Sequence, residues 1–180
     1  MNLSIQNTSI PEVKIIQQFK AKDLRGEFVK PFHYTDLKAA GIDFVMKESF
    51  YSISKKDVIR GMHFHAPPFD HEKIVFCTHG AIIDVALDLR KSAPTYGQYI
   101  SQELSQENGK ALLIPKGFAH GFLCLTDGAT TFYFISGEYN AQADGGVMYD
   151  SFGFDWKVSN PVLSERDKQF VTLQNFKSPF

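Results

Sequence analysis

A series of short strand patterns separated by glycine-containing turns fills the centre of this 180-residue chain and constrains its fold most. The patterns are rich in Val, Ile, Leu and aromatic residues and lie at residues 73–78, 81–90, 110–115, 120–126 and 130–136. His79-Gly80 separates the first two patterns, and Asp127-Gly128 forms a hairpin signal between the last two. Frequent short strands of this kind predict an all-β antiparallel sandwich or barrel.

Helix patterns are few and short. Residues 34–42 form one, which ends at Gly41 as a C′ glycine, and residues 163–170 form another with Ser164 as its N-cap. The length suits one well-buried core. We therefore expect a single domain over 1–180. Its N-terminal arm covers about 1–25, and a C-terminal short helix and tail cover about 160–180; both are expected to be less strand-like and to wrap the core.

Composition excludes several classes of partner. The net charge of −1 predicts no general attraction to nucleic acid or to anionic membranes. The first residues lack the pattern of a signal peptide, and no stretch approaches the ~18 apolar residues of a membrane span. Cys77 and Cys124 each lie in an apolar run, which indicates buried thiols in a reducing cytoplasm, although spacing alone leaves a disulfide open.

Four of the six histidines lie in or just after the stretch RGMHFHAPPFDHEK, residues 60–73. Further along, GKALLIPKGFAH has the spacing of the second consensus motif of the cupin jelly rolls, and the histidine stretch fits the first motif loosely. Histidines on the inner face of a small β-barrel suit a metal or a buried ligand. One hypothesis is therefore a metal-dependent cupin, an oxygenase or a sugar isomerase, with the ligands His63, His65, Glu72 and His120.

A second resemblance covers residues 23–167. The segments DLRGEF, RGMHFH, EKIV, GAIIDVALDLRKSAPTYG, LSQENGKALLIPKGFAHGFL, TTFYF and NPVLSERD occur in this order. Together they resemble the nucleotide-sugar 3,5-epimerases typified by dTDP-4-dehydrorhamnose 3,5-epimerase. The resemblance implies a cupin-type jelly-roll homodimer that needs no metal or cofactor and inverts stereocentres beside a 4-keto group. In that case the cupin motif reports the fold and not a metal.

The resemblance also implies a catalytic set. His63 corresponds to the base that removes a proton next to the ketone, and Asp167 to its carboxylate partner. For Asp167 the alternative is a capping box with Ser164. Lys73 corresponds to the lysine beside the developing enolate, and Tyr133 to the acid that returns a proton from the opposite face.

The substrate-binding positions are less regular. Arg25 and Arg60 match arginines that bind the diphosphate. Phe28 is expected near the nucleotide base, from the partner subunit. His120 is expected to be a supporting residue. Three other residues lie in segments that depart from the family pattern and are expected on the substrate side: Glu48, His65 and Tyr139. His71 and His79 are expected to be exposed. A retained catalytic set with changed substrate contacts predicts the same chemistry on a different 4-keto sugar or nucleotide, or inversion of one centre only. A ketoisomerase acting on the same substrates remains an alternative.

Overall fold

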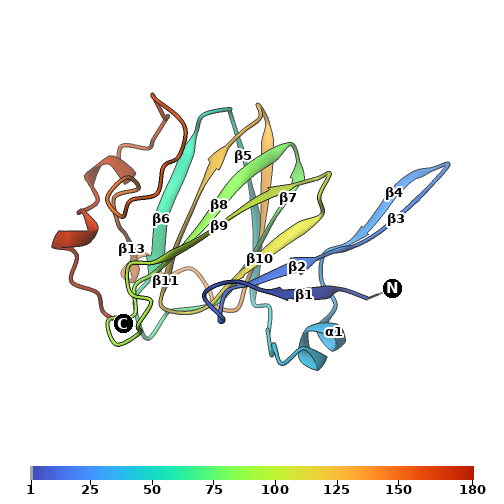
Figure 1. Ribbon diagram of the computed structural model, residues 1–180, viewed down its shortest axis with the longest axis horizontal. Helices are drawn as coiled ribbons and strands as arrows, with labels where there is room; N and C mark the ends of the chain where they lie inside the picture. The colour runs from blue at the N-terminus through green and yellow to red at the C-terminus, as the bar shows by residue number, and fades with distance from the viewer. Residues whose placement is uncertain (1) are drawn as a thin grey trace.

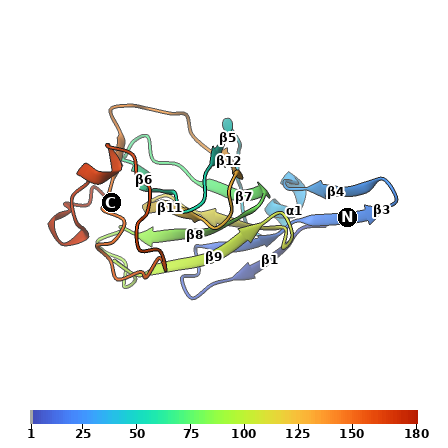
Figure 2. The same cartoon turned by 90° about the horizontal axis from the view of Figure 1, so that it is seen from above.

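Two antiparallel sheets face each other across the interior in the computed structural model, which describes residues 2–180 (Figures 1 and 2). The larger sheet has the order β1-β2-β10-β7-β12-β5, and the smaller has the order β13-β6-β11-β8-β9. The strands of the larger sheet are β1 (Ser4–Asn7), β2 (Lys14–Gln17), β5 (Glu48–Ser54), β7 (Lys73–His79), β10 (Lys110–Ile114) and β12 (Ala129–Ile135). Those of the smaller sheet are β6 (Ile59–His65), β8 (Ala81–Asp88), β9 (Tyr99–Ser105), β11 (Phe118–Cys124) and β13 (Asp144–Gly146).

The all-β prediction is confirmed, and each of the five predicted strands is present within about two residues of its expected ends. The N-terminal region contains more strand than the sequence suggested. β1 and β2 extend the larger sheet through β10, while β3 (Phe19–Asp23) and β4 (Gly26–Lys30) form a separate hairpin. This hairpin projects from the body of the molecule (Figures 1 and 2).

The two predicted helices differ in outcome. α1 (Tyr34–Ala39) ends at the expected glycine: Gly41 has φ +81°, and the N–H of Ile42 donates to the carbonyl of Leu37. The predicted helix 163–170 is wrong in extent. Only a 3-10 turn, η1 (Asp167–Gln169), forms there, and a second turn follows, η2 (Leu173–Asn175). The first turn stops because Phe170 is extended and packs edge-on against the ring of His63.

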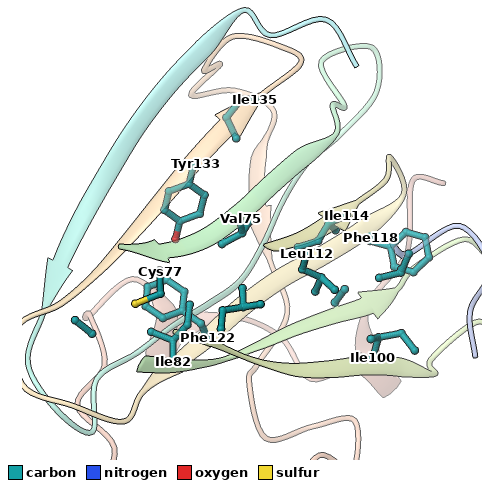
Figure 3. Packing of buried hydrophobic residues seen from close by; sticks show 14 of the residues in the cluster. Val75, Cys77, Ile82, Ile100, Leu112, Ile114, Phe118, Phe122, Tyr133 and Ile135 are labelled. Carbon is teal, nitrogen blue, oxygen red and sulfur yellow. The ribbon is translucent and has the colours of Figure 1, made fainter. Parts of the chain in front are cut away.

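Apolar side chains from both sheets fill the interior (Figure 3). In β8, Ile82 and Ala86 belong to this cluster, and Asp84 lies between them with the same two-residue period. Cys77 and Cys124 are both buried here as free thiols, as predicted. Among residues 2–180, no helix is long and apolar enough to cross a membrane.

β6 and β11 approach each other so closely that Gly61 cannot be replaced without rearrangement. A Cβ at Gly61 would meet Cα of Gly121 and lie 2.8 Å from the carbonyl oxygen of His120.

We predict that Gly61→Ala lowers the free energy of unfolding by about 3 kcal/mol or more, because strain at its positive φ adds to overpacking. Gly153 has φ +82° but no atom near the position of its Cβ. Gly153→Ala is therefore the control, with an expected loss of only about 1–2 kcal/mol in urea denaturation. Equal losses would contradict the close contact.

Candidate active site

His63 lies on β6 beside a cavity of about 370 Å³. The cavity is formed where β6 meets the C-terminal segment, and its lining residues are Val58, Ile59, Arg60, His63, Val162, Leu163, Ser164, Arg166 and Asp167. The side chain of His63 is 30% exposed, so one edge of the imidazole is accessible from the cavity. Arg60 is held by a 2.9 Å hydrogen bond from its Nε to Oγ of Ser54.

Asp167, which lines the same cavity, orients His63. Nε2 of His63 donates to Oδ1 of Asp167 at 2.9 Å, and the backbone N–H of Gly61 donates to Oδ2 at 3.1 Å. Burial alone would raise the pKa of Asp167, but the hydrogen bonds from His63 and Gly61 outweigh it and leave the pKa below its ordinary value. Because Nε2 carries the proton, Nδ1 of His63 has the free lone pair of a base.

Asp167 makes both the predicted contact with Ser164 and the contact with His63, because it uses different atoms for each. The backbone N–H of Asp167 donates to Oγ of Ser164 at 3.1 Å, as in a cap. The carboxylate of Asp167 is engaged separately, with His63 and Gly61. The cap and the carboxylate–imidazole pair therefore coexist.

A second buried imidazole–carboxylate pair lies beside the first. His120 on β11 is the register partner of His63 on β6, and its Nε2 donates to Oδ1 of Asp84 at 2.6 Å. His120 is 4% exposed and Asp84 is fully buried. Burial lowers the pKa of His120, and Asp84 opposes this shift only in part. Asp84 was not among the sequence candidates, although its place between Ile82 and Ala86 on the inner face of β8 was a usable signal.

Tyr133 and Lys73 enter the interior from the larger sheet. Figure 3 shows the hydroxyl of Tyr133 directed between the sheets, and its ring lies 5.8 Å from that of His120 in an edge-on arrangement. Burial strongly raises the pKa of Tyr133, so the phenol stays protonated at neutral pH. Lys73, at the start of β7, is half-buried. Its pKa falls to about 8 because burial outweighs the attraction of Asp144 and Asp84.

Glu48, His65 and Tyr139, the three residues from segments that differ from the family pattern, form one wall around the end of β6. The ring of His65 lies 5.6 Å from that of Tyr139, and the N–H of Tyr139 donates to Oε2 of Glu48 at 2.8 Å. On its other side, the ring of His65 lies 4.6 Å from that of His71. The structure therefore brings Glu48, His65 and Tyr139 together.

The expectation that His71 is exposed is wrong, whereas His79 is exposed as predicted. His71 is buried because Nδ1 donates to the carbonyl of Phe69 at 3.1 Å and the ring packs against Gly137. A Cβ on Gly137 would lie 2.8 Å from the ring. Burial lowers the pKa of His71 to about 4, so it is neutral at physiological pH.

Two substrate-binding candidates do not reach the cavity of their own chain. Arg25 and Phe28 lie on the β3–β4 hairpin, which points away from the body (Figure 1). Arg25 is paired with Asp23 at 2.6 Å, and Phe28 packs edge-on against Phe19.

The predicted metal ligands do not form a metal site. His63 and His120 each donate Nε2–H to a carboxylate, and His65 packs between aromatic rings. Throughout the described range 2–180, no group of three or more His, Cys, Asp or Glu side chains is arranged to hold a metal ion. The geometry does not support the metal-dependent hypothesis.

Comparison with known proteins agrees with this arrangement. The family described as dTDP-4-dehydrorhamnose 3,5-epimerase matches residues 7–175. The dTDP-4-dehydrorhamnose 3,5-epimerase of Sinorhizobium fredii is 41% identical over 93% of this chain and 88% of its own length. A dTDP-4-dehydrorhamnose 3-epimerase of Streptomyces niveus is 34% identical over 84% of this chain and 74% of its own.

A solved structure shows the same fold. The dTDP-6-deoxy-D-glucose-3,5-epimerase of Legionella pneumophila, in complex with dTDP-4-keto-L-rhamnose, superposes with a TM-score of 0.93 at 33% identity. The match covers 98% of this chain and 95% of the Legionella chain.

The lowered pKa of Asp167 predicts a pH-dependent contribution to stability. An unfolded carboxyl titrates near its ordinary value of 3.8, and the folded one titrates lower, so the stabilisation is complete above pH 3.8 and is lost as pH falls through the folded pKa. We expect Asp167→Asn to lower the free energy of unfolding by about 2 kcal/mol at pH 7, and by progressively less below pH 3.8. Denaturant titrations across this range measure the difference, with the exposed Asp150→Asn as control. A difference that does not change with pH would count against the charged pair.

Proposed function

Because the chain belongs to the dTDP-4-dehydrorhamnose 3,5-epimerase family, it is an isomerase, and we propose that its substrate is a nucleotide-linked 4-keto-6-deoxy sugar. The observation that carries this proposal is the His63–Asp167 pair, which shares one cavity with Arg60. The pair suits the removal of a proton next to a ketone, and the guanidinium suits a diphosphate.

In the first half-reaction, His63 removes the proton from the carbon beside the 4-keto group. Asp167 stabilises the imidazolium that forms, since it accepts the hydrogen bond from Nε2 and is itself ionised. The electron pair moves onto the ketone oxygen as an enolate. Lys73 provides positive charge for this oxyanion. Its pKa is lowered because burial destabilises the charged ammonium.

In the second half-reaction, Tyr133 donates its phenolic proton to the opposite face of the same carbon. His63 and Tyr133 come from different sheets, β6 and β12, which supports an approach to opposite faces of one carbon, as an inversion requires. The same two residues serve C5 or C3, depending on how the sugar ring is placed. His120 lies next to both residues, as the register partner of His63 and with its ring 5.8 Å from that of Tyr133.

The remaining residues bind the substrate. Arg60 binds the diphosphate, and the wall of Glu48, His65 and Tyr139 contacts the sugar or the base. Arg25 and Phe28 complete the site of the second subunit of a homodimer, because their hairpin leaves its own body. We place the enzyme in the cytoplasm, where its two free thiols are stable.

Deuterium incorporation tests the proposed roles. In D2O, after exhaustive chelation, the wild-type enzyme should exchange and invert C5, C3 or both on a dTDP-4-keto-6-deoxy sugar. His63→Ala should lose exchange and inversion by about two to four orders of magnitude. Tyr133→Phe should keep exchange but lose inversion, because the base remains while the opposite-face donor is gone.

Three outcomes would contradict these assignments. Activity that disappears on chelation would restore the metal hypothesis. Parallel loss of exchange and inversion in Tyr133→Phe would exclude Tyr133 as the acid and point to water or Tyr139. A shifted carbonyl in the product would identify a ketoisomerase.

Subunit mixing tests the homodimer. Sedimentation at micromolar concentration should give twice the mass of the chain. His63→Ala and Arg25→Ala should each be inactive alone. After joint unfolding and refolding, about a quarter of the wild-type sites should reappear, because each mixed dimer regains one intact site. A monomer, or mixing without recovery, would show that the hairpin does not serve a partner.

A further inference from the structure

Each inversion leaves the enzyme in the wrong protonation state for the next one. If His63 takes a proton and Tyr133 gives one, as proposed above, the site ends with an imidazolium and a phenolate. One proton must then travel from His63 to Tyr133 before another carbon can react. Tyr133 is only 7% exposed, so bulk water reaches it poorly, whereas the side chain of His63 is 30% exposed.

His120 lies between these two residues. It is the register partner of His63 across β6 and β11, where paired side chains on one face of a sheet lie about 4.5–5.5 Å apart at Cβ. Its ring is also 5.8 Å from that of Tyr133. Because Nε2 donates to Asp84, Nδ1 of His120 has a free lone pair that can accept a proton.

Beyond His120, the interior contains hydrogen-bonding atoms without partners. Within residues 2–180, Oδ2 of Asp84, Oγ1 of Thr131 and Oγ of Ser52 are buried and make no hydrogen bond. Thr131 and Ser52 are register partners on β12 and β5, and Thr131 is two residues from Tyr133 on the same inner face. Buried polar atoms of this kind are usually satisfied by ordered water.

We propose that the His120–Asp84 pair returns the proton from His63 to Tyr133 after each inversion, through water bound between Asp84, Thr131 and Ser52. This role rests on the proposed function of His63 and Tyr133. His120 and Asp84 do not touch the substrate and act as positioning and relay residues.

The transfer balances without any other reactant. The His63 imidazolium gives its proton to Nδ1 of His120, and His120 becomes an imidazolium held by Asp84. His120 then passes the same Nδ1 proton through the water to the phenolate oxygen of Tyr133, while its Nε2–H stays hydrogen-bonded to Asp84. His63 returns to a neutral base, Tyr133 to a neutral phenol, and His120 to a neutral imidazole, whose lowered pKa favours this release.

Rapid-quench kinetics can separate this role from a structural one. With His120→Phe, the first inversion does not need the relay, so it should keep nearly the wild-type rate. Product should appear as a burst of one inverted centre per active site. Later turnovers should be about 10- to 100-fold slower, because Tyr133 must then wait for bulk water. Asp84→Asn should give the same burst, and the wild-type enzyme should give none.

Matched threonines test the water path. Thr131→Val removes one buried hydroxyl at nearly constant volume and should slow only the turnovers after the first. Thr130→Val, on the outer face of the same strand, should leave both phases unchanged. Equal loss of the first and later turnovers in His120→Phe and Asp84→Asn, or wild-type kinetics in both, would overturn the relay. An inactive wild-type enzyme would instead reject the proposed function.

Discussion

The close contact between β6 and β11 is the constraint on which the active site depends. Neither Gly61 nor Gly121 has room for a side chain, because a Cβ on either would press on backbone atoms of the opposite strand. The contact fixes the register that places His63 opposite His120. It also leaves the N–H of Gly61 free to bind Asp167, which draws the C-terminal segment onto the barrel. The close contact of the two backbones at Gly61 and Gly121 thus positions both imidazole–carboxylate pairs.

Burial of Asp84, Asp167 and His120 in this interior is tolerated because each is paired. An isolated buried carboxylate is costly, but Asp84 and Asp167 each accept a hydrogen bond from an imidazole. The two pairs differ in solvent access: His63 borders a cavity, and His120 does not. This difference suits a base that meets substrate and a second histidine that works only with its protein neighbours. It also explains why the pKa of His120 is lowered despite its carboxylate.

The sequence predicted the elements with local signals and missed those set by distant contacts. The strands β7, β8, β10, β11 and β12 were predictable because alternation and Gly turns are local, whereas β9 was missed. β1 and β2 were missed because they are short and depend on a distant partner: β2 pairs with β10, about ninety residues away, and β1 pairs with β2. The His63–Asp167 contact spans 104 positions and came only from a family resemblance. The burial of His71 depends on the space left by Gly137, which no pattern near His71 reveals.

The number of inverted centres has to be decided by the walls of the site and not by its acid–base groups. Relatives named as 3,5-epimerase and as 3-epimerase match this chain over most of its length. Since one base and one acid can serve either carbon, the choice depends on which C–H bond the bound ring presents to His63. The residues proposed to hold the ring lie in segments that depart from the family pattern. There, His65 packs between His71 and Tyr139, and burial keeps His71 uncharged. Beside the Glu48 carboxylate, the neutral rings of this wall favour stacking on a sugar or nucleobase, so we expect shape to contribute to substrate selection as well as charge.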